Sequence, residues 1–301
     1  MTALGTNEIA TSGPGTNDTP GARRIRAAFA AARADGRVAL VPYVVAGYPD
    51  AETSYRAALA AADAGADLLE VGLPYSDPLA DGATLQHAAS AALAGGATLD
   101  GSIRLLERIA AARPGLPLVP MCYANQVIGG GDGREAAARL RGAGAAGIIV
   151  ADLTPDEGVR FEPVAREAGL AVVYLVAPTT PPSRRAAIAA RSGGFLYCVS
   201  LVGVTGARSS LPRSVGRLVR EVVAASSIPV AVGFGVSRPS HIRAIARAGA
   251  DGAIVASALV DALGPDGRDV DAFAGLVASL REATATARAA STPSPRTAAP
   301  A

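Results

Sequence analysis

The sequence predicts an α/β fold, a single (β/α)8 TIM barrel, over residues 21–284. Eight short apolar runs of β type alternate with Ala- and Arg-rich segments whose apolar residues recur at helical spacing. The runs are almost continuously apolar, which indicates parallel strands buried on both faces. Eight such units in about 220 residues fit a closed barrel better than an open doubly wound sheet.

The first expected element is a helix over residues 21–35 that covers the bottom of the barrel. The expected strands follow at 39–46, 67–71, 118–122, 147–151, 171–176, 195–200, 229–234 and 252–256. The expected helices between them include 51–64, 99–112, 134–142, 155–168 and 238–248. Several of these helices stop at an Ala-Gly pair, and glycine favours the left-handed turn that ends a helix.

The gap after the second strand is long and is expected to hold a loop and two helices, at about 85–93 and 99–112. An insertion after a barrel strand lies on the face where active sites are built. Residues 1–20 and 285–301 are mixtures rich in Ala, Thr, Ser and Pro with little to pack, so two disordered tails are expected.

The composition excludes several classes of function. The 28 basic and 26 acidic residues balance, which indicates neither a nucleic-acid nor a membrane partner. No apolar run reaches the roughly 18 residues of a membrane span, and the amino terminus lacks a signal-peptide pattern. Cys122 and Cys198 lie in apolar runs and are expected to be inert core residues. A cytoplasmic location is expected.

The absence of lysine is more informative, because every basic residue is an arginine. A Schiff-base lysine and a lysine-dependent phosphate loop are therefore both excluded. The two histidines, His87 and His241, are far apart in the sequence and follow no zinc spacing, so no metal site is expected. Catalysis would depend on carboxylates, hydroxyls and backbone amides.

The segment from Leu68 to Gly82 is the strongest candidate for acid/base chemistry. Glu70 lies near the carboxyl end of the second expected strand, the position from which barrel enzymes direct catalytic groups. The alternative for Glu70 is a salt bridge with an arginine at the barrel mouth. Asp77 and Asp81 follow on the loop, and Asp77 is interpreted as a turn residue.

Gly- and Ser-rich strand ends predict a phosphate site. The sixth strand runs into Gly203-Val204-Thr205-Gly206, the seventh ends in Gly233-Phe234-Gly235, and the eighth ends in Ala256-Ser257 before a short helix. Barrel enzymes commonly bind phosphate with the loops after strands seven and eight, using backbone N–H groups and a helix amino terminus. Tyrosines at strand ends, Tyr43, Tyr123 and Tyr197, either fill the barrel mouth or line an aromatic pocket.

These motifs together resemble those of the tryptophan synthase alpha subunit family over about residues 25–281. The resemblance is carried by Pro42-Tyr43-Val44, Gly47-Tyr48-Pro49, Glu70 through Gly82 with Gln86, Tyr123-Ala124-Asn125, Ala151-Asp152-Leu153, Gly203-Val204-Thr205-Gly206, Gly233-Phe234-Gly235 and Ser257. It implies cofactor-free retro-aldol cleavage of indole-3-glycerol phosphate to indole and glyceraldehyde 3-phosphate in tryptophan biosynthesis. It also implies a cytoplasmic α2β2 heterotetramer, in which pyridoxal phosphate belongs to the β subunit.

The resemblance also implies roles for individual residues. Glu70 is the family's catalytic acid/base, Asp81 holds the indole N–H, and Thr205 makes a lid contact with the loop that carries Asp81. The expected phosphate-binding residues are Gly206, Gly235, Ala256 and Ser257. The expected indole pocket consists of Tyr43, Leu85, Met121, Ile149, Tyr197 and Phe234. The sequence departs from the family at Ala256, where glycine is common, and at Leu201, where some members carry arginine.

Three functions remain open from the sequence. The first is a biosynthetic α subunit that passes indole to a pyridoxal-phosphate β subunit. The second is a stand-alone lyase that releases free indole for a secondary pathway. The third is a non-catalytic regulatory barrel that activates a partner, against which both carboxylates and the phosphate motifs argue.

Overall fold

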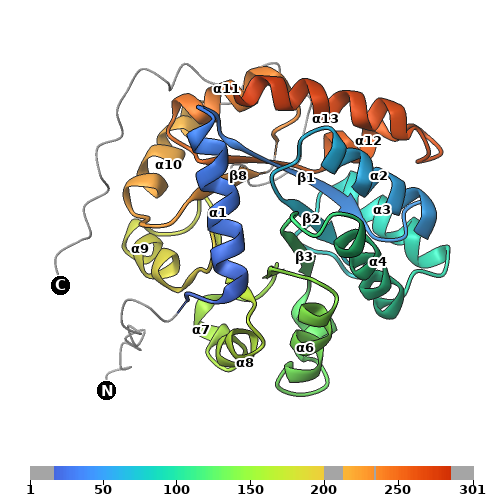
Figure 1. Cartoon of the computed structure of the whole chain (residues 1–301). Coiled ribbons are helices and arrows are strands. Elements are labelled where there is room, and N and C mark those ends of the chain that lie inside the picture. The colour runs from blue at the N-terminus through green and yellow to red at the C-terminus, as the bar shows by residue number, and fades with distance from the viewer. Residues whose placement is uncertain (1–16, 200–212, 234, 286–301) are drawn as a thin grey trace.

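The protein contains a parallel sheet that curls into a barrel (Figure 1). The computed structural model describes residues 17–199, 213–233 and 235–285. Over these residues the strands are β1 (Ala39–Val45), β2 (Leu69–Gly72), β3 (Leu118–Cys122), β4 (Gly147–Val150), β5 (Ala171–Val173), β6 (Leu175–Val176), β7 (Leu196–Val199), β8 (Val230–Gly233) and β9 (Gly252–Val255). They lie in the order β5-β4-β3-β2-β1-β9-β8-β7-β6, and all the pairings are parallel. The strands are almost entirely buried, as their apolar sequences predict.

The two ends of this sheet meet at Tyr174, which alone separates β5 from β6. Its carbonyl accepts a hydrogen bond from the N–H of Tyr197 at 3.1 Å. Its own N–H donates to Ser192 Oγ at 3.0 Å instead of to a strand. The expected strand 171–176 is therefore divided in two. The (β/α)8 barrel is confirmed, with β5 and β6 as the two halves of its fifth strand.

The helices surround the barrel (Figure 1). Their bounds are α1 (Pro20–Ala34), α2 (Ala51–Asp63), α3 (Ala83–Ala94), α4 (Leu99–Ala112), α5 (Ala124–Ile128), α6 (Arg134–Gly142), α7 (Pro155–Gly158), α8 (Phe161–Glu167), α9 (Pro182–Arg191), α10 (Arg213–Ala224), α11 (Pro239–Arg247), α12 (Ser257–Ala262) and α13 (Val270–Thr284). None of these helices is long and apolar enough to cross a membrane, in the part of the chain that the structure describes.

The single helix expected over 155–168 is two helices, α7 and α8. Gly158 ends α7, and glycine is a poor helix former because of its backbone freedom. A Cβ at this position would lie 2.0 Å from the hydroxyl oxygen of Tyr174. Only glycine fits at this position, because the Tyr174 hydroxyl packs against the backbone where a Cβ would lie, and the helix is less stable there as a result.

Helix α1 lies across the end of the barrel that faces the viewer in Figure 1. Thr19 caps its amino terminus by accepting the N–H of Ala22 at 3.0 Å. Phe29 is buried, and its ring lies 5.6 Å from that of Phe195, which directly precedes β7. The helix therefore closes the amino-terminal end of the strands, which leaves the carboxyl end for a site.

The long insertion after β2 contains α3 and α4, as expected. Helix α3 begins directly after Gly82 and packs against α12 and β1. Helix α4 is amphipathic, begins at the N-cap Thr98 and packs against α2. The insertion thus brings the loop that carries Asp81 over the carboxyl ends of the central strands.

Candidate active site

A cavity opens at the carboxyl ends of the strands, where barrel enzymes place their active sites. About 570 Å³ of space not filled by protein atoms, open solvent at its mouth included, lies between its walls. Strands β1, β2, β3 and β7 contribute Tyr43, Glu70, Met121 and Tyr197. The loops and helix ends contribute Asp81, Gly82, Ala83, Thr84, Leu85, Gly235, Val236, Ala256 and Ser257.

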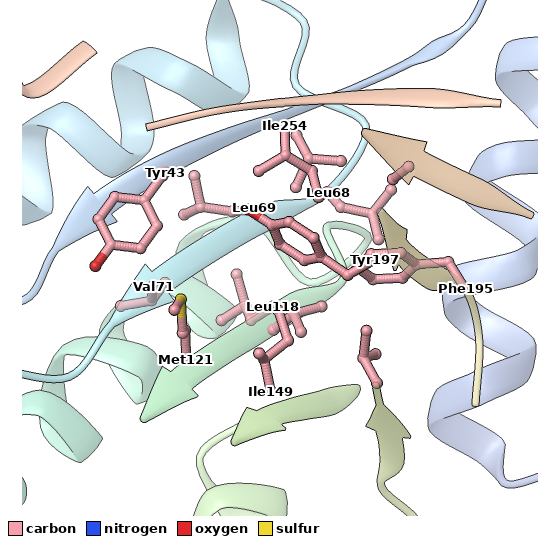
Figure 2. Close-up of a cluster of buried hydrophobic side chains, with 14 of the residues drawn as sticks. Tyr43, Leu68, Leu69, Val71, Leu118, Met121, Ile149, Phe195, Tyr197 and Ile254 are labelled. Atoms are coloured by element: carbon pink, nitrogen blue, oxygen red, sulfur yellow. The ribbon is translucent and has the colours of Figure 1, made fainter. Parts of the chain in front are cut away.

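Two glycines make room for the tyrosine rings of this cavity. Side chains alternate along a strand, so Glu70 and Gly72 lie on one face of β2. A Cβ on Gly72 would lie 1.8 Å from the hydroxyl oxygen of Tyr43, and one on Gly233 would lie 2.3 Å from that of Tyr197. Both rings lie within the barrel (Figure 2). Burial raises the pKa of both hydroxyls, so they remain protonated.

Glu70 is buried, and no described residue forms an ion pair with it. The residue is only 1% exposed, and its Oε2 atom has no hydrogen-bond partner among the described residues. By contrast, the buried carboxylates of Glu162 and Asp251 form ion pairs with arginines. Because Glu70 makes no salt bridge in the part of the chain described by the structure, the structural alternative for this residue has no support.

This burial determines the protonation of Glu70. An ionised carboxylate without a partner is costly in a low-dielectric interior. Burial, reinforced by the negative charge of Asp81, raises the pKa of Glu70 to about 8. Glu70 therefore holds a proton at neutral pH and can donate it to a substrate in the cavity.

Asp81 is the second carboxylate of the cavity. Burial raises its pKa to about 6, and a hydrogen-bonding interaction with the Tyr123 hydroxyl opposes this rise. Its Oδ1 atom is buried with no hydrogen-bond partner among the described residues. Between about pH 6 and pH 8, the cavity thus presents a protonated Glu70 and an ionised Asp81. That is a proton donor together with an acceptor for an N–H group.

Tyr123 fixes the loop that carries Asp81. It follows β3 directly, and its hydroxyl accepts the N–H of Ala80 at 3.1 Å. The ring of Tyr75 stacks on it, with centroids 5.0 Å apart and an interplanar angle of 21°. Because this hydroxyl accepts the N–H of the residue directly before Asp81, Tyr123 fixes the backbone that carries the Asp81 side chain.

Two glutamines fix the same loop at other points. Gln126 of α5 donates from Nε2 to the carbonyl of Pro74 at 3.0 Å. Gln86 of α3 donates from Nε2 to the carbonyl of Asp81 at 2.9 Å. The loop is thus bound on both sides by helices that flank the barrel mouth.

The side of the cavity where the sequence predicts a phosphate site has no cationic side chain among its described lining residues. Gly235 has φ of +77°, a left-handed conformation that glycine adopts readily. Ser257 is the first residue of α12, and Ala256 is its N-cap. Backbone N–H groups and the Ser257 hydroxyl are therefore available for an anion.

The structure brings most of the predicted site residues together. Those that line the cavity are Tyr43, Glu70, Asp81, Leu85, Met121, Tyr197, Gly235, Ala256 and Ser257. Ile149 does not line it: this residue is fully buried in β4, paired with Met121 of β3. Figure 2 shows Ile149 in the buried cluster below Met121. Thr205, Gly206 and Phe234 lie outside the described residues, as does Leu201.

Sequence reasoning missed several residues of the site. Val236 and Thr84 line the cavity, and Tyr123 and the two glutamines hold the loop. The sequence did place Tyr123 at the barrel mouth and included Gln86 in the resemblance, but it did not predict that either side chain holds the loop. Nothing local in the sequence links Tyr123 to Ala80, because the contact joins residues 43 positions apart.

Comparisons with known proteins agree with this architecture. Residues 29–287 match the family model described as tryptophan synthase alpha chain. The tryptophan synthase alpha chain of Roseiflexus castenholzii is 45% identical over 240 residues, which are 80% of this chain and 91% of the relative. That of Prochlorococcus marinus is 46% identical over 239 residues, 78% of this chain and 85% of the relative.

Solved structures show the same similarity. A structure of Mycobacterium tuberculosis tryptophan synthase aligns with a TM-score of 0.79 at 40% identity, covering 87% of this chain and 98% of that one. A mutant tryptophan synthase α-subunit from Pyrococcus furiosus aligns with a TM-score of 0.75 at 35% identity, covering 82% and 99%. With a family model that spans most of the barrel and relatives at this level of identity, the chain belongs to the tryptophan synthase alpha chain family.

Proposed function

We propose that this chain cleaves indole-3-glycerol phosphate to indole and glyceraldehyde 3-phosphate, with Glu70 as the acid/base and Asp81 as the partner of the indole N–H. The observation that carries the assignment is a buried Glu70, without an ion-pair partner among the described residues, that lines one cavity together with Asp81. An ionised carboxylate that is buried without a partner destabilises the fold. A barrel that only regulated a partner would have no use for such a group, so the burial of Glu70 argues against that function. The reaction uses no cofactor of this chain.

The two carboxylates divide the chemistry between them. Protonated Glu70 donates its proton to C3 of the indole ring, which leaves a positive charge shared with the ring nitrogen. Ionised Asp81 accepts a hydrogen bond from the ring N–H and stabilises that charge. The Glu70 carboxylate then takes the proton of the glycerol hydroxyl next to the ring. The C–C bond breaks, its electrons return to the ring, and an aldehyde forms. Each positioned proton transfer contributes about 10²–10⁴-fold in rate.

The phosphate group is assigned to the other wall of the cavity. Gly235, Ala256 and Ser257 lie at the ends of β8 and β9, whereas Glu70 lies on β2. Strand β1 lies between β2 and β9 in the sheet, so the two groups are separated across the mouth. A substrate with an aromatic ring at one end and a phosphate at the other fits this separation. Gly206 is proposed to complete the phosphate site, and Thr205 to close the lid over Asp81.

We expect a bell-shaped dependence of kcat/KM on pH. Because the pKa of Asp81 is raised to about 6, activity should fall below that pH as Asp81 becomes protonated and can no longer accept the indole N–H. Because the pKa of Glu70 is raised to about 8, activity should fall above that pH as the proton donor is lost. Initial rates of indole formation between pH 5 and pH 9.5 measure both limbs. A flat profile across this range would contradict the assignment.

The partner is the tryptophan synthase β subunit, which holds the pyridoxal phosphate, in an α2β2 assembly. One feature that supports docking near the site is Leu79, a large apolar side chain that is 91% exposed on the loop carrying Asp81. Both cysteines are free thiols, which agrees with the proposed cytoplasmic location.

Indole release by the purified chain, measured with and without the β subunit, tests the assignment to a biosynthetic α subunit. We expect slow release by the chain alone and a marked acceleration when the β subunit is added. Fast release that the β subunit does not change would instead support the stand-alone lyase.

A further inference from the structure

His241 is a buried titratable residue that the mechanism above does not use. It is 3% exposed and lies in the first turn of α11. The turn between β8 and α11 supplies Gly235 and Val236 to the cavity. His241 is therefore adjacent in the fold to the wall assigned to phosphate.

The imidazole contacts this turn through one nitrogen. Nδ1 lies 3.3 Å from the backbone nitrogen of Ser237 and accepts its N–H, and Ser237 Oγ is 3.5 Å away. A nitrogen that accepts a hydrogen bond carries a lone pair, so the ring proton is assigned to Nε2. Nε2 is buried and has no hydrogen-bond partner among the described residues. Among the described residues, Ser237 is thus the polar partner of this imidazole.

The Ser237 N–H needs such an acceptor. The N-cap of α11 is Arg238, whose side chain makes no cap hydrogen bond and whose carbonyl accepts the N–H of His241 at 2.9 Å. Ser237 precedes the cap and lies outside both β8 and α11, so neither ladder supplies an acceptor for its N–H. In a capping box, the third helical residue reaches back to the N-cap amide. His241 is the third helical residue, and it reaches one residue further back.

We propose that His241 is a positioning residue for the phosphate end of the substrate, acting through Ser237. Strand β8 fixes one end of the turn, and the His241–Ser237 hydrogen bond fixes the other. Gly235 and Val236 lie between these two points and face the cavity. The imidazole therefore sets the path of the backbone that meets the phosphate group. This inference rests on the proposed function.

The test compares two substitutions at this position in the full chain. His241→Leu fills the space but removes the acceptor, whereas His241→Asn places an amide oxygen close to the position of Nδ1. For His241→Leu we expect KM for indole-3-glycerol phosphate to rise roughly three- to tenfold, the equivalent of one hydrogen bond, with kcat changed by less than about twofold. His241→Asn should restore KM to near the wild-type value. Ser240→Ala, an exposed neighbour on the same turn, is the matched control and should change neither constant.

Binding of two fragments separates positioning from general disruption. The dissociation constant of inorganic phosphate, measured by titration calorimetry, should rise in His241→Leu by the same factor as KM, while the dissociation constant of indole should stay unchanged. A wild-type KM and phosphate affinity in His241→Leu would overturn the proposal. Equal weakening of phosphate and indole, or an Asn variant as impaired as the Leu variant, would overturn it as well. If wild-type chain forms no indole, the proposed reaction fails, and the phosphate measurements still decide the role of His241.

Discussion

Replacing Glu70 with glutamine is expected to lower kcat for indole formation by about 10²–10⁴-fold. Glutamine has nearly the same shape but can neither donate the proton to indole C3 nor take the proton from the glycerol hydroxyl. Because the rest of the cavity is unchanged, KM should change little. The measurement is the steady-state rate of indole formation, with and without the β subunit. A Glu70→Gln variant with wild-type kcat would show that another group performs the proton transfers.

The same substitution should stabilise the fold. The folded-state pKa of Glu70 is raised from 4.5 to about 8, so the folded state binds its proton more tightly than the unfolded state. The stability linked to this proton is complete below pH 4.5 and is lost as the pH rises through 8. At pH 7 this loss is on the order of 3 kcal/mol. Glutamine does not titrate, so Glu70→Gln should unfold at a higher temperature than the wild type at neutral pH.

Glu162→Gln is the matched control for this stability effect. Glu162 is also buried, but it pairs with Arg191 at 2.7 Å and accepts the Tyr174 hydroxyl at 2.5 Å. Breaking a buried ion pair leaves an uncompensated charge, which costs about 3–5 kcal/mol. Thermal unfolding should therefore shift in opposite directions for the two variants. A shift in the same direction would contradict the distinction between the carboxylate proposed to be catalytic, which has no ion-pair partner among the described residues, and a paired structural one.

Replacing Asp81 with asparagine is expected to lower kcat/KM by about 10²–10³-fold, the typical cost of removing one preorganised electrostatic group. The amide can still contact the indole N–H, but it carries no charge to stabilise the positive charge on the ring. The low-pH limb of the pH profile should disappear as well, because that limb is assigned to Asp81. The measurement is the pH dependence of indole formation by the variant.

Asp77→Asn is the control on the same loop. Asp77 is exposed, and its carboxylate accepts the neighbouring Ser76 hydroxyl. We expect its basal rate of indole formation to stay within about twofold of the wild type, in line with an exposed turn residue. If Asp77→Asn lowered the basal rate as much as Asp81→Asn, the special role of Asp81 would be contradicted.

The order of strands and helices could be predicted from the sequence because each apolar run is short and each is followed by an amphipathic segment. Strand β3 and helix α4 have the predicted bounds. The predictions failed where a tertiary contact overrides the local pattern. Tyr174 divides the fifth strand because its N–H bonds Ser192, and its hydroxyl packs against Gly158, where α7 ends. No local periodicity reveals such contacts.

The site could be predicted in part for a related reason. Glu70, Asp81 and the Gly- and Ser-rich strand ends are local motifs, and the closed barrel brings them to one mouth. How deep a side chain lies in the barrel depends on how the strands are placed relative to one another, which a local motif does not specify. Met121 and Ile149 are register partners on β3 and β4, yet only Met121 lines the cavity. The hydrogen bonds that fix the loop also join distant segments, so Tyr123 could be placed at the mouth but not against the loop at Ala80.

Cleavage of indole-3-glycerol phosphate in deuterium oxide tests the central claim most directly. If Glu70 exchanges its proton with solvent and delivers it to the ring, the indole released should carry one deuterium at C3. Glyceraldehyde 3-phosphate should appear in equal amount, and Glu70→Gln should remove both signals. Mass spectrometry and NMR of the products measure the label. Indole without deuterium at C3, or labelled indole formed at the wild-type rate by Glu70→Gln, would contradict the account.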